Sequence, residues 1–189
     1  MFNIVKAPNP ILRSDAKLVK KITDKHQEII KEMVQTTLSF EDPEGVGLAA
    51  TQIGISEQFF IAKFDVGSGS TSKPEAASER APTSFVVVFN PKILWVSKKE
   101  RTTLEGCLSI PEYYGDVARP STIKVSYQDL DGKEIKETLR GVNATIFQHE
   151  FDHLHGRLFI DLVMQQKSRI YKIVGKDERG DDIFEEVSL

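Results

Sequence analysis

The chain has 189 residues, of which 40% are hydrophobic, and its formal net charge is −3 at pH 7. This length and composition predict one domain, residues 1–189, and give no basic patch that would suggest direct nucleic-acid recognition. The single cysteine, Cys107, excludes an intrachain disulfide. No stretch approaches the roughly 20 apolar residues of a membrane span, and the N-terminus lacks an apolar signal segment. We therefore expect a cytoplasmic protein without membrane contact.

Hydrophobic periodicity predicts an amphipathic helix near the N-terminus, after an irregular segment over residues 1–22. Apolar residues recur at helical spacing from Ile29 to Leu38, and Thr23 provides a start signal. His26 lies in the polar part of this helix, so we predict a solvated surface histidine.

Short apolar or alternating runs predict strands at 58–64, 85–89, 93–96, 99–104, 122–128 and 134–140. Asp131-Gly132 predicts a hairpin turn between the last two. Residues 66–84 are rich in Ser, Ala, Pro and Gly, which predicts a flexible surface loop.

The C-terminal third is predicted to contain a second helix and a hairpin. The helix covers residues 142–155 and ends at Gly156, and the hairpin pairs residues 169–174 with 183–189. The fold class is therefore α+β. We expect mixed or antiparallel sheets around the second helix, which is central, with the amphipathic helix at one end of the chain and the β-hairpin at the other.

The second helix carries the segment QHEFDHLHG, residues 148–156. His149 and His153 are four residues apart, so a helix presents both imidazoles on one face, with Glu150 beside them for proton transfer. The alternative is a solvated helix face that carries these charges by chance. His155 points elsewhere, and Asp152 is interpreted as a helix-stabilising or supporting charge.

A catalytic metal site needs a third protein ligand. Zinc proteases with this helix pattern supply a later glutamate or histidine. Here no glutamate occurs between Glu150 and Glu178, and Phe159 stands where the histidine would be. Cys107, in the segment LEGCLSIP, is a reasonable third ligand, although a lone cysteine is more often a small buried hydrophobe.

Three segments in order resemble the motifs of the peptide deformylase family: GVGLAATQ (45–52), EGCLS (105–109) and QHEFDHLHG (148–156). The opening APNPILR is similar too, and the resemblance spans about residues 1–165. It implies a metal-dependent hydrolase that removes the formyl group from N-formylmethionine on nascent polypeptides. These substrates emerge near the ribosome exit region, which the resemblance implies as a transient partner.

The resemblance also implies roles for individual residues. Cys107, His149 and His153 would bind Fe²⁺, which Ni²⁺, Co²⁺ or Zn²⁺ can replace, and Glu150 would be the general acid and base. Gln52 and the backbone amide of Leu108 would bind the formyl oxygen, with Gly47 in the tight loop beside them.

The methionine side chain needs an apolar pocket, for which Val46, Val142 and Ile146 are the candidates; ordinary core packing is the alternative for all three. Gly45 and Gly47 would let the backbone approach the metal. Glu105 and Arg119 flank the second motif and are expected to form a buried ion pair that stiffens the Cys107 loop.

Three features depart from the family pattern. They are the long segment 66–84, the Tyr113-Tyr114 pair where some members have an arginine, and a C-terminal hairpin in place of a basic helix. Two other functions stay open: a metalloprotease, and a non-enzymatic protein with a structural metal. The missing protease ligand disfavours the first, and the presence of only three candidate ligands disfavours the second.

Overall fold

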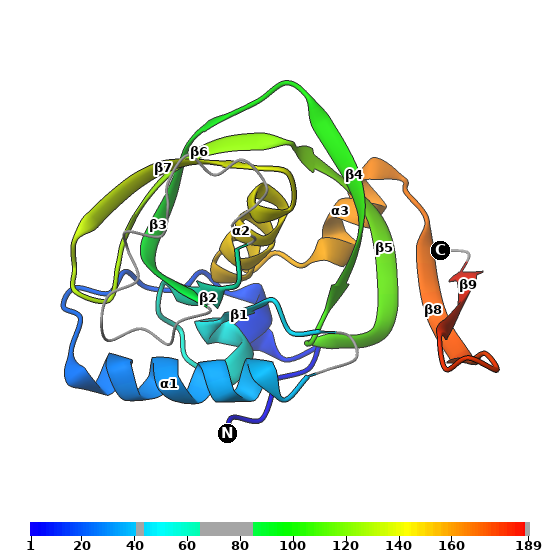
Figure 1. Ribbon diagram of the computed structural model, residues 1–189, viewed down its shortest axis with the longest axis horizontal. Helices are drawn as coiled ribbons and strands as arrows, with labels where there is room; N and C mark the ends of the chain where they lie inside the picture. Colours follow the sequence, from blue (N-terminus) through cyan, green and yellow to red (C-terminus); the bar gives the residue numbers. More distant parts are fainter. Residues whose placement is uncertain (41–43, 65–84, 188–189) are drawn as a thin grey trace.

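Three α-helices and two antiparallel sheets make up the computed structural model, which describes residues 1–40, 44–64 and 85–187 (Figure 1). The elements are η1 Pro10–Arg13, α1 Asp24–Leu38, β1 Gly47–Ala49, η2 Ala50–Ile53, β2 Phe59–Ala62, β3 Val86–Val96, β4 Glu100–Cys107, β5 Ile110–Pro120, β6 Thr122–Gln128, β7 Glu134–Arg140, α2 Gly141–Leu154, α3 Phe159–Gln166, β8 Ile170–Lys176 and β9 Asp182–Val187. The predicted α+β class is confirmed. The loop predicted at 66–84 lies outside the described residues.

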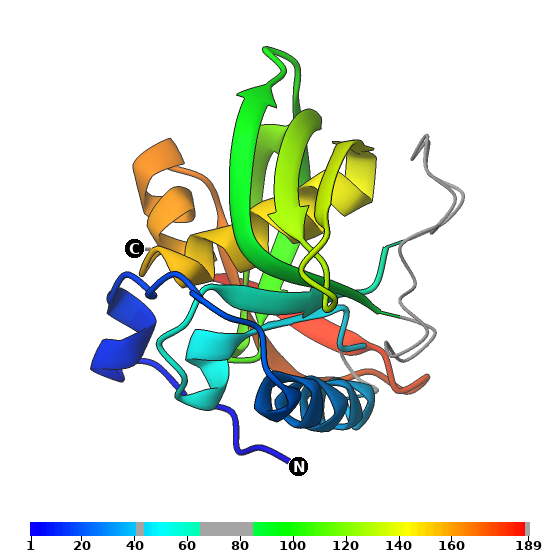
Figure 2. The same ribbon diagram turned by 90° about the vertical axis from the view of Figure 1, so that its left-hand side faces the viewer.

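The two sheets enclose α2. One sheet has the order β1-β2-β3-β6-β7 and the other the order β4-β5-β8-β9, and neighbouring strands are antiparallel throughout. Figure 1 shows α2 between the β3-β6-β7 side and the β4-β5 side, and Figure 2 shows it passing behind the long strands of the first sheet. The helix that bears both histidines is therefore central, as predicted.

Helix α1 packs on the first sheet through a buried stripe that includes Ile30, Met33 and Val34. Its start at Asp24 agrees with the prediction, but the prediction of a solvated His26 is wrong. His26 is buried, and its Nδ1 accepts a hydrogen bond from the Thr23 amide at 3.0 Å. Its ring packs edge-on against two phenylalanines of the core. The imidazole therefore caps the helix and fills the core at the same time.

Among the α-helices and strands of the described residues, helix α3, strand β5 and the three-residue strand β1 have no counterpart in the prediction. Helix α3 has eight residues, which is too short to display a helical repeat, and it packs on β5. Strand β5 begins at Ile110 and ends at Pro120, and it contains Pro111 and Gly115 as well. Proline and glycine are uncommon within strands, so they mask its pattern in the sequence.

Helix α2 is anchored by an aromatic cluster on the side away from its histidines. Phe147 is fully buried, and its ring centroid lies 5.2 Å from that of Phe60 in an edge-to-face contact. The rings of Tyr127 and Phe151 flank it at 6.3 and 6.5 Å. At the end of the helix, Gly156 adopts φ +65°, and a Cβ there would lie 2.6 Å from the Arg13 backbone. Packing therefore determines both the position and the end of this helix.

Replacing Phe147 with alanine should lower the free energy of unfolding by about 3–5 kcal/mol, because a large cavity opens beneath α2. Urea denaturation followed by circular dichroism measures this change. Leu94→Ala serves as the control, since Leu94 is 55% exposed, and should change the value by less than about 0.5 kcal/mol. Equal effects of the two variants would contradict the proposed role of this cluster.

Candidate metal centre

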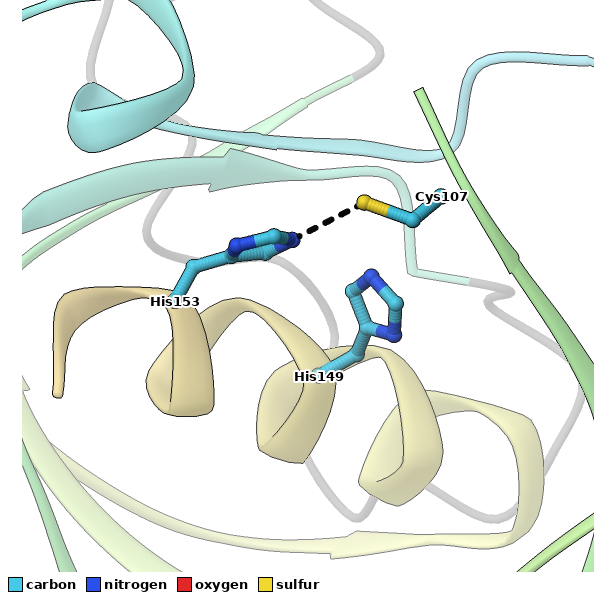
Figure 3. A group of neighbouring side chains, drawn as sticks. All are labelled: Cys107, His149 and His153. Carbon is cyan, nitrogen blue, oxygen red and sulfur yellow. Dashed lines mark hydrogen bonds between the residues drawn. The ribbon is translucent and has the colours of Figure 1, made fainter. Parts of the chain in front are cut away.

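Helix α2 presents His149 and His153 on one face, one turn apart. Their ring centroids lie 5.0 Å from each other. Figure 3 shows both rings directed from the helix toward Cys107. The backbone carbonyl of His153 accepts a hydrogen bond from the Thr51 hydroxyl at 3.2 Å, which ties this end of the helix to η2. The spacing deduced from the sequence thus produces the expected pair.

Cys107 is the last residue of β4, in the β4-β5-β8-β9 sheet, and it faces the two histidines of α2. Its Sγ lies 3.2 Å from His153 Nε2. The N-terminal segment holds the loop that follows: Lys6 Nζ donates to the Leu108 carbonyl at 2.5 Å, and the Ala7 amide donates to the Ser109 carbonyl at 2.9 Å. The thiol is therefore fixed by elements far apart in the chain.

The donor atoms of Cys107, His149 and His153 all lie within 4.8 Å of one another. Bonds of about 2.3 Å to sulfur and 2.0–2.1 Å to nitrogen place the ligands of one ion at comparable separations. One thiolate and two imidazoles suit Fe²⁺, Co²⁺, Ni²⁺ and Zn²⁺. Within 1–40, 44–64 and 85–187, no other group of three His, Cys, Asp or Glu residues meets this criterion. The residues therefore fit a transition metal.

Cys107 and His149 each stabilise the charged form of the other. Burial raises the pKa of the thiol, but the facing His153 and His149 outweigh it and hold the pKa well below its usual value. Burial also lowers the pKa of His149, whereas Cys107 and Glu105 hold it well above its usual value. The site thus favours the thiolate, which is the form that binds metals.

A chain of buried charges stands behind His149. Its Nδ1 lies 2.9 Å from Glu105 Oε2. Arg119 contacts both oxygens of Glu105, at 2.6 and 3.0 Å, which confirms the predicted ion pair. Burial raises the pKa of Glu105, but His149 and Arg119 together lower it to about 2. Glu105 therefore stays ionised and holds His149 with its other nitrogen toward the thiolate.

Asp152 lies behind Arg119, further from the metal ligands. Arg119 Nη1 donates a hydrogen bond to Asp152 Oδ2 at 2.7 Å, so Asp152 supports the Glu105–Arg119 ion pair from α2. The carboxylate that orients the metal ligand His149 is therefore Glu105 of β4. The spacing of residues on α2 cannot reveal this contact, because Glu105 lies on a different element. His155 is exposed, and its Nδ1 lies 2.8 Å from the Phe151 carbonyl oxygen, away from the group, as expected.

Glu150 lies beside the metal ligands, and its carboxylate is buried against Gly47. A Cβ on Gly47 would approach Glu150 Oε1 to 2.3 Å. Burial raises the pKa of Glu150 to about 7. Among the described residues, its Oε2 has no hydrogen-bond partner. A carboxyl group in this state can accept and release a proton near neutral pH.

Gln52 is held with its amide nitrogen toward Cys107. Its Oε1 accepts from the Ala49 amide at 2.8 Å, which determines which end of the side chain faces the site. Its Nε2 lies 3.3 Å from Ser109 Oγ and 3.5 Å from Cys107 Sγ. Gln52 therefore presents a hydrogen-bond donor beside the metal ligands.

A cavity of about 620 Å³ opens onto this group. All the expected site residues except the more deeply buried His153 line it: Val46, Gly47, Gln52, Cys107, Leu108, Val142, Ile146, His149 and Glu150. Gly45 lines the cavity too. A Cβ there would meet the Thr37 carbonyl of α1 at 2.3 Å, so this glycine also permits close packing against that helix.

Replacing Glu105 with alanine should weaken metal binding by about 10–100-fold, because His149 loses the partner that orients it. Competition with a chromophoric chelator measures the affinity, and circular dichroism checks the fold. Glu134→Ala is the control, since Glu134 is an exposed carboxylate on β7 that contacts Ser126. Unchanged metal affinity in a folded Glu105→Ala variant would contradict this role.

Comparison with known proteins agrees with the geometry of the site. The polypeptide deformylase family matches residues 1–169. The peptide deformylase of Thermotoga petrophila is 40% identical over 167 residues, which cover 88% of this chain and 90% of that protein.

Solved structures show the same fold. The crystal structure of the peptide deformylase from Thermotoga maritima has a TM-score of 0.71 at 40% identity, covering 86% of this chain and 97% of that one. The Synechococcus elongatus enzyme, solved in complex with actinonin, has a TM-score of 0.72 at 34% identity, covering 85% and 78% respectively. The chain therefore belongs to the polypeptide deformylase family.

Proposed function

We propose that this chain removes the formyl group from formylmethionine at the start of nascent polypeptides, releasing formate, through the residues described above. The observation that carries the proposal is the Cys107, His149 and His153 group with the protonatable Glu150 at its side. The family is metal-dependent, and we infer Fe²⁺ as the ion, with Ni²⁺, Co²⁺ or Zn²⁺ able to take its place. When bound, the ion supplies Lewis acidity that makes water a nucleophile near neutral pH.

Gln52 and Leu108 would bind the oxygen of the formyl group. The Gln52 amide nitrogen is directed toward Cys107 by the Ala49 contact, so it needs no rearrangement to donate. The Leu108 backbone amide follows the cysteine directly in the chain. Donors held in place for a developing negative charge are typically worth about 2.7–4 kcal/mol each.

Glu150 would move the proton of the reaction. It accepts a proton from the attacking water and delivers it to the amine as the C–N bond of the formamide breaks. The products are formate and a free N-terminal methionine. Its buried position beside Gly47 keeps the carboxyl group within a pKa range, about 7, where both steps are accessible.

Val46, Val142 and Ile146 would surround the methionine side chain. Val46 and Val142 are 39% and 42% exposed, and both line the cavity, so an apolar ligand would cover surface that now faces solvent. Ala49 and Ala50 are fully buried and belong to the core.

We further propose that the chain is a single catalytic domain that acts in the cytoplasm. It would meet its formylated substrates transiently near the ribosome exit region, without direct recognition of RNA. In the part of the chain that the structure describes, no helix has the length and apolar character needed to cross a bilayer.

Formate release from a formyl-Met peptide tests the proposal, with anaerobically prepared Fe²⁺ or Ni²⁺ protein. Glu150→Gln should retain its metal and lower kcat by about 10²–10⁴-fold, because the proton carrier is lost. Glu178→Gln, at an exposed position, is the control and should match the parent protein. Cleavage of internal peptide bonds would favour a protease, and no turnover with either metal would refute the proposed function.

A further inference from the structure

The N-terminal segment Val5–Ala7 joins the two elements that would bind the formyl oxygen. The Val5 amide donates to the Gln52 carbonyl at 2.8 Å, and the Ala7 amide donates to the Ser109 carbonyl at 2.9 Å. Figure 1 shows this segment in dark blue beside the turn between β4 and β5. The segment therefore ties η2 to the loop that follows the cysteine.

The side chain of Lys6, in the middle of this segment, reaches the same loop. Its Nζ donates to the Leu108 carbonyl at 2.5 Å. A hydrogen bond from a charged donor is shorter and stronger than one between neutral groups. Lys6 also lines the cavity, so this contact lies at the edge of the site.

The Leu108 carbonyl shares one peptide group with the Ser109 amide, which donates to Cys107 Sγ at 3.4 Å. Because a peptide group is planar, a contact that holds its oxygen also orients its N–H. A hydrogen bond accepted by the carbonyl also polarises the N–H at the other end of the group. Lys6 and Cys107 thus hold this peptide group from opposite ends.

The backbone of Leu108 is held on both sides as a result. Cys107 precedes it, and the peptide group that follows it is fixed by Lys6 and by the sulfur. Each residue has only two soft backbone dihedral angles, so fixing its neighbours determines where the Leu108 N–H points. Gln52 Nε2 lies 3.3 Å from Ser109 Oγ, so the same loop also aligns the second donor.

We propose that Lys6 is a positioning residue: by holding the Leu108 carbonyl, it directs the Leu108 amide toward the formyl oxygen. The proposal deepens the proposed deformylase function and rests on it. In this role Lys6 acts through Leu108 and does not bind the substrate. Donors aimed at a developing negative charge act mainly in the transition state, so Lys6 should influence kcat more than KM.

Formate release from formyl-Met-Ala by the Ni²⁺ protein tests the inference. Lys6→Met removes the donor but keeps a long side chain, and it should lower kcat about tenfold, less than the roughly 10²–10³-fold loss of a whole oxyanion donor. KM should change by less than about twofold. Lys6→Arg keeps a charged donor and should restore kcat to within about threefold of the parent value. Lys31→Met is the control, because Lys31 is exposed on α1, and it should match the parent protein.

A second measurement reads the contact itself. In the Zn²⁺ protein, the nuclear magnetic resonance of the Ser109 amide reports on the Leu108 carbonyl, because both belong to one peptide group. This resonance should shift more in Lys6→Met than in Lys6→Arg. A tether that only stabilised the fold would lower the melting temperature and leave kcat of the folded protein unchanged.

A parent value of kcat in a folded Lys6→Met variant would overturn the inference. A rise in KM alone, or a failure of Lys6→Arg to restore kcat, would overturn it as well. Lys6→Gln, which is uncharged and shorter, provides a second variant in case Lys6→Met unfolds, and circular dichroism distinguishes the two cases. These outcomes leave the deformylase function standing. No formate from the parent protein with Ni²⁺ or Fe²⁺ would refute that function and this inference with it.

Discussion

The site depends on one buried chain of charges, Arg119–Glu105–His149, which joins β5, β4 and α2. Cys107 lies two residues after Glu105 on the same strand, so the ion pair positions the thiolate strand and one imidazole together. Removing a single partner from a buried ion pair typically costs about 3–5 kcal/mol, because the other charge is left uncompensated. The contacts of Asp152 with Arg119 and of the N-terminal segment with the 108–109 loop then reinforce this arrangement from either side.

Two glycines determine how closely other groups approach the ligands. Gly47 leaves space for the Glu150 carboxylate, and Gly106 leaves space for the Tyr114 ring. The first contact buries the carboxyl group and raises its pKa to about 7, and the second places the ring between β4 and Phe184 of β9. Gly47 thus makes room for the proton-transfer group, and Gly106 makes room for a ring that shapes the cavity.

Much of the site could be predicted because its determinants are local or depend on ligand type. Helical spacing placed His149, Glu150 and His153, and the need for a third ligand led to Cys107. The contact between Glu105 and His149 joins residues 44 positions apart, and the β8–β9 hairpin reaches the cavity only through the pairing of β8 with β5. His26 was misjudged because its polar neighbours in sequence are not its neighbours in the fold. Helix α3 and strand β5 were missed because one is short and the other contains residues uncommon in strands.

The central claim is that Cys107, His149 and His153 bind one metal ion through a thiolate. Anaerobic titration with Co²⁺, followed by absorption spectroscopy, tests it most directly. The account predicts one ion per chain and a sulfur-to-cobalt charge-transfer band, with the band absent in a folded Cys107→Ser variant. Tight binding without that band, or a band that persists in Cys107→Ser, would contradict the claim.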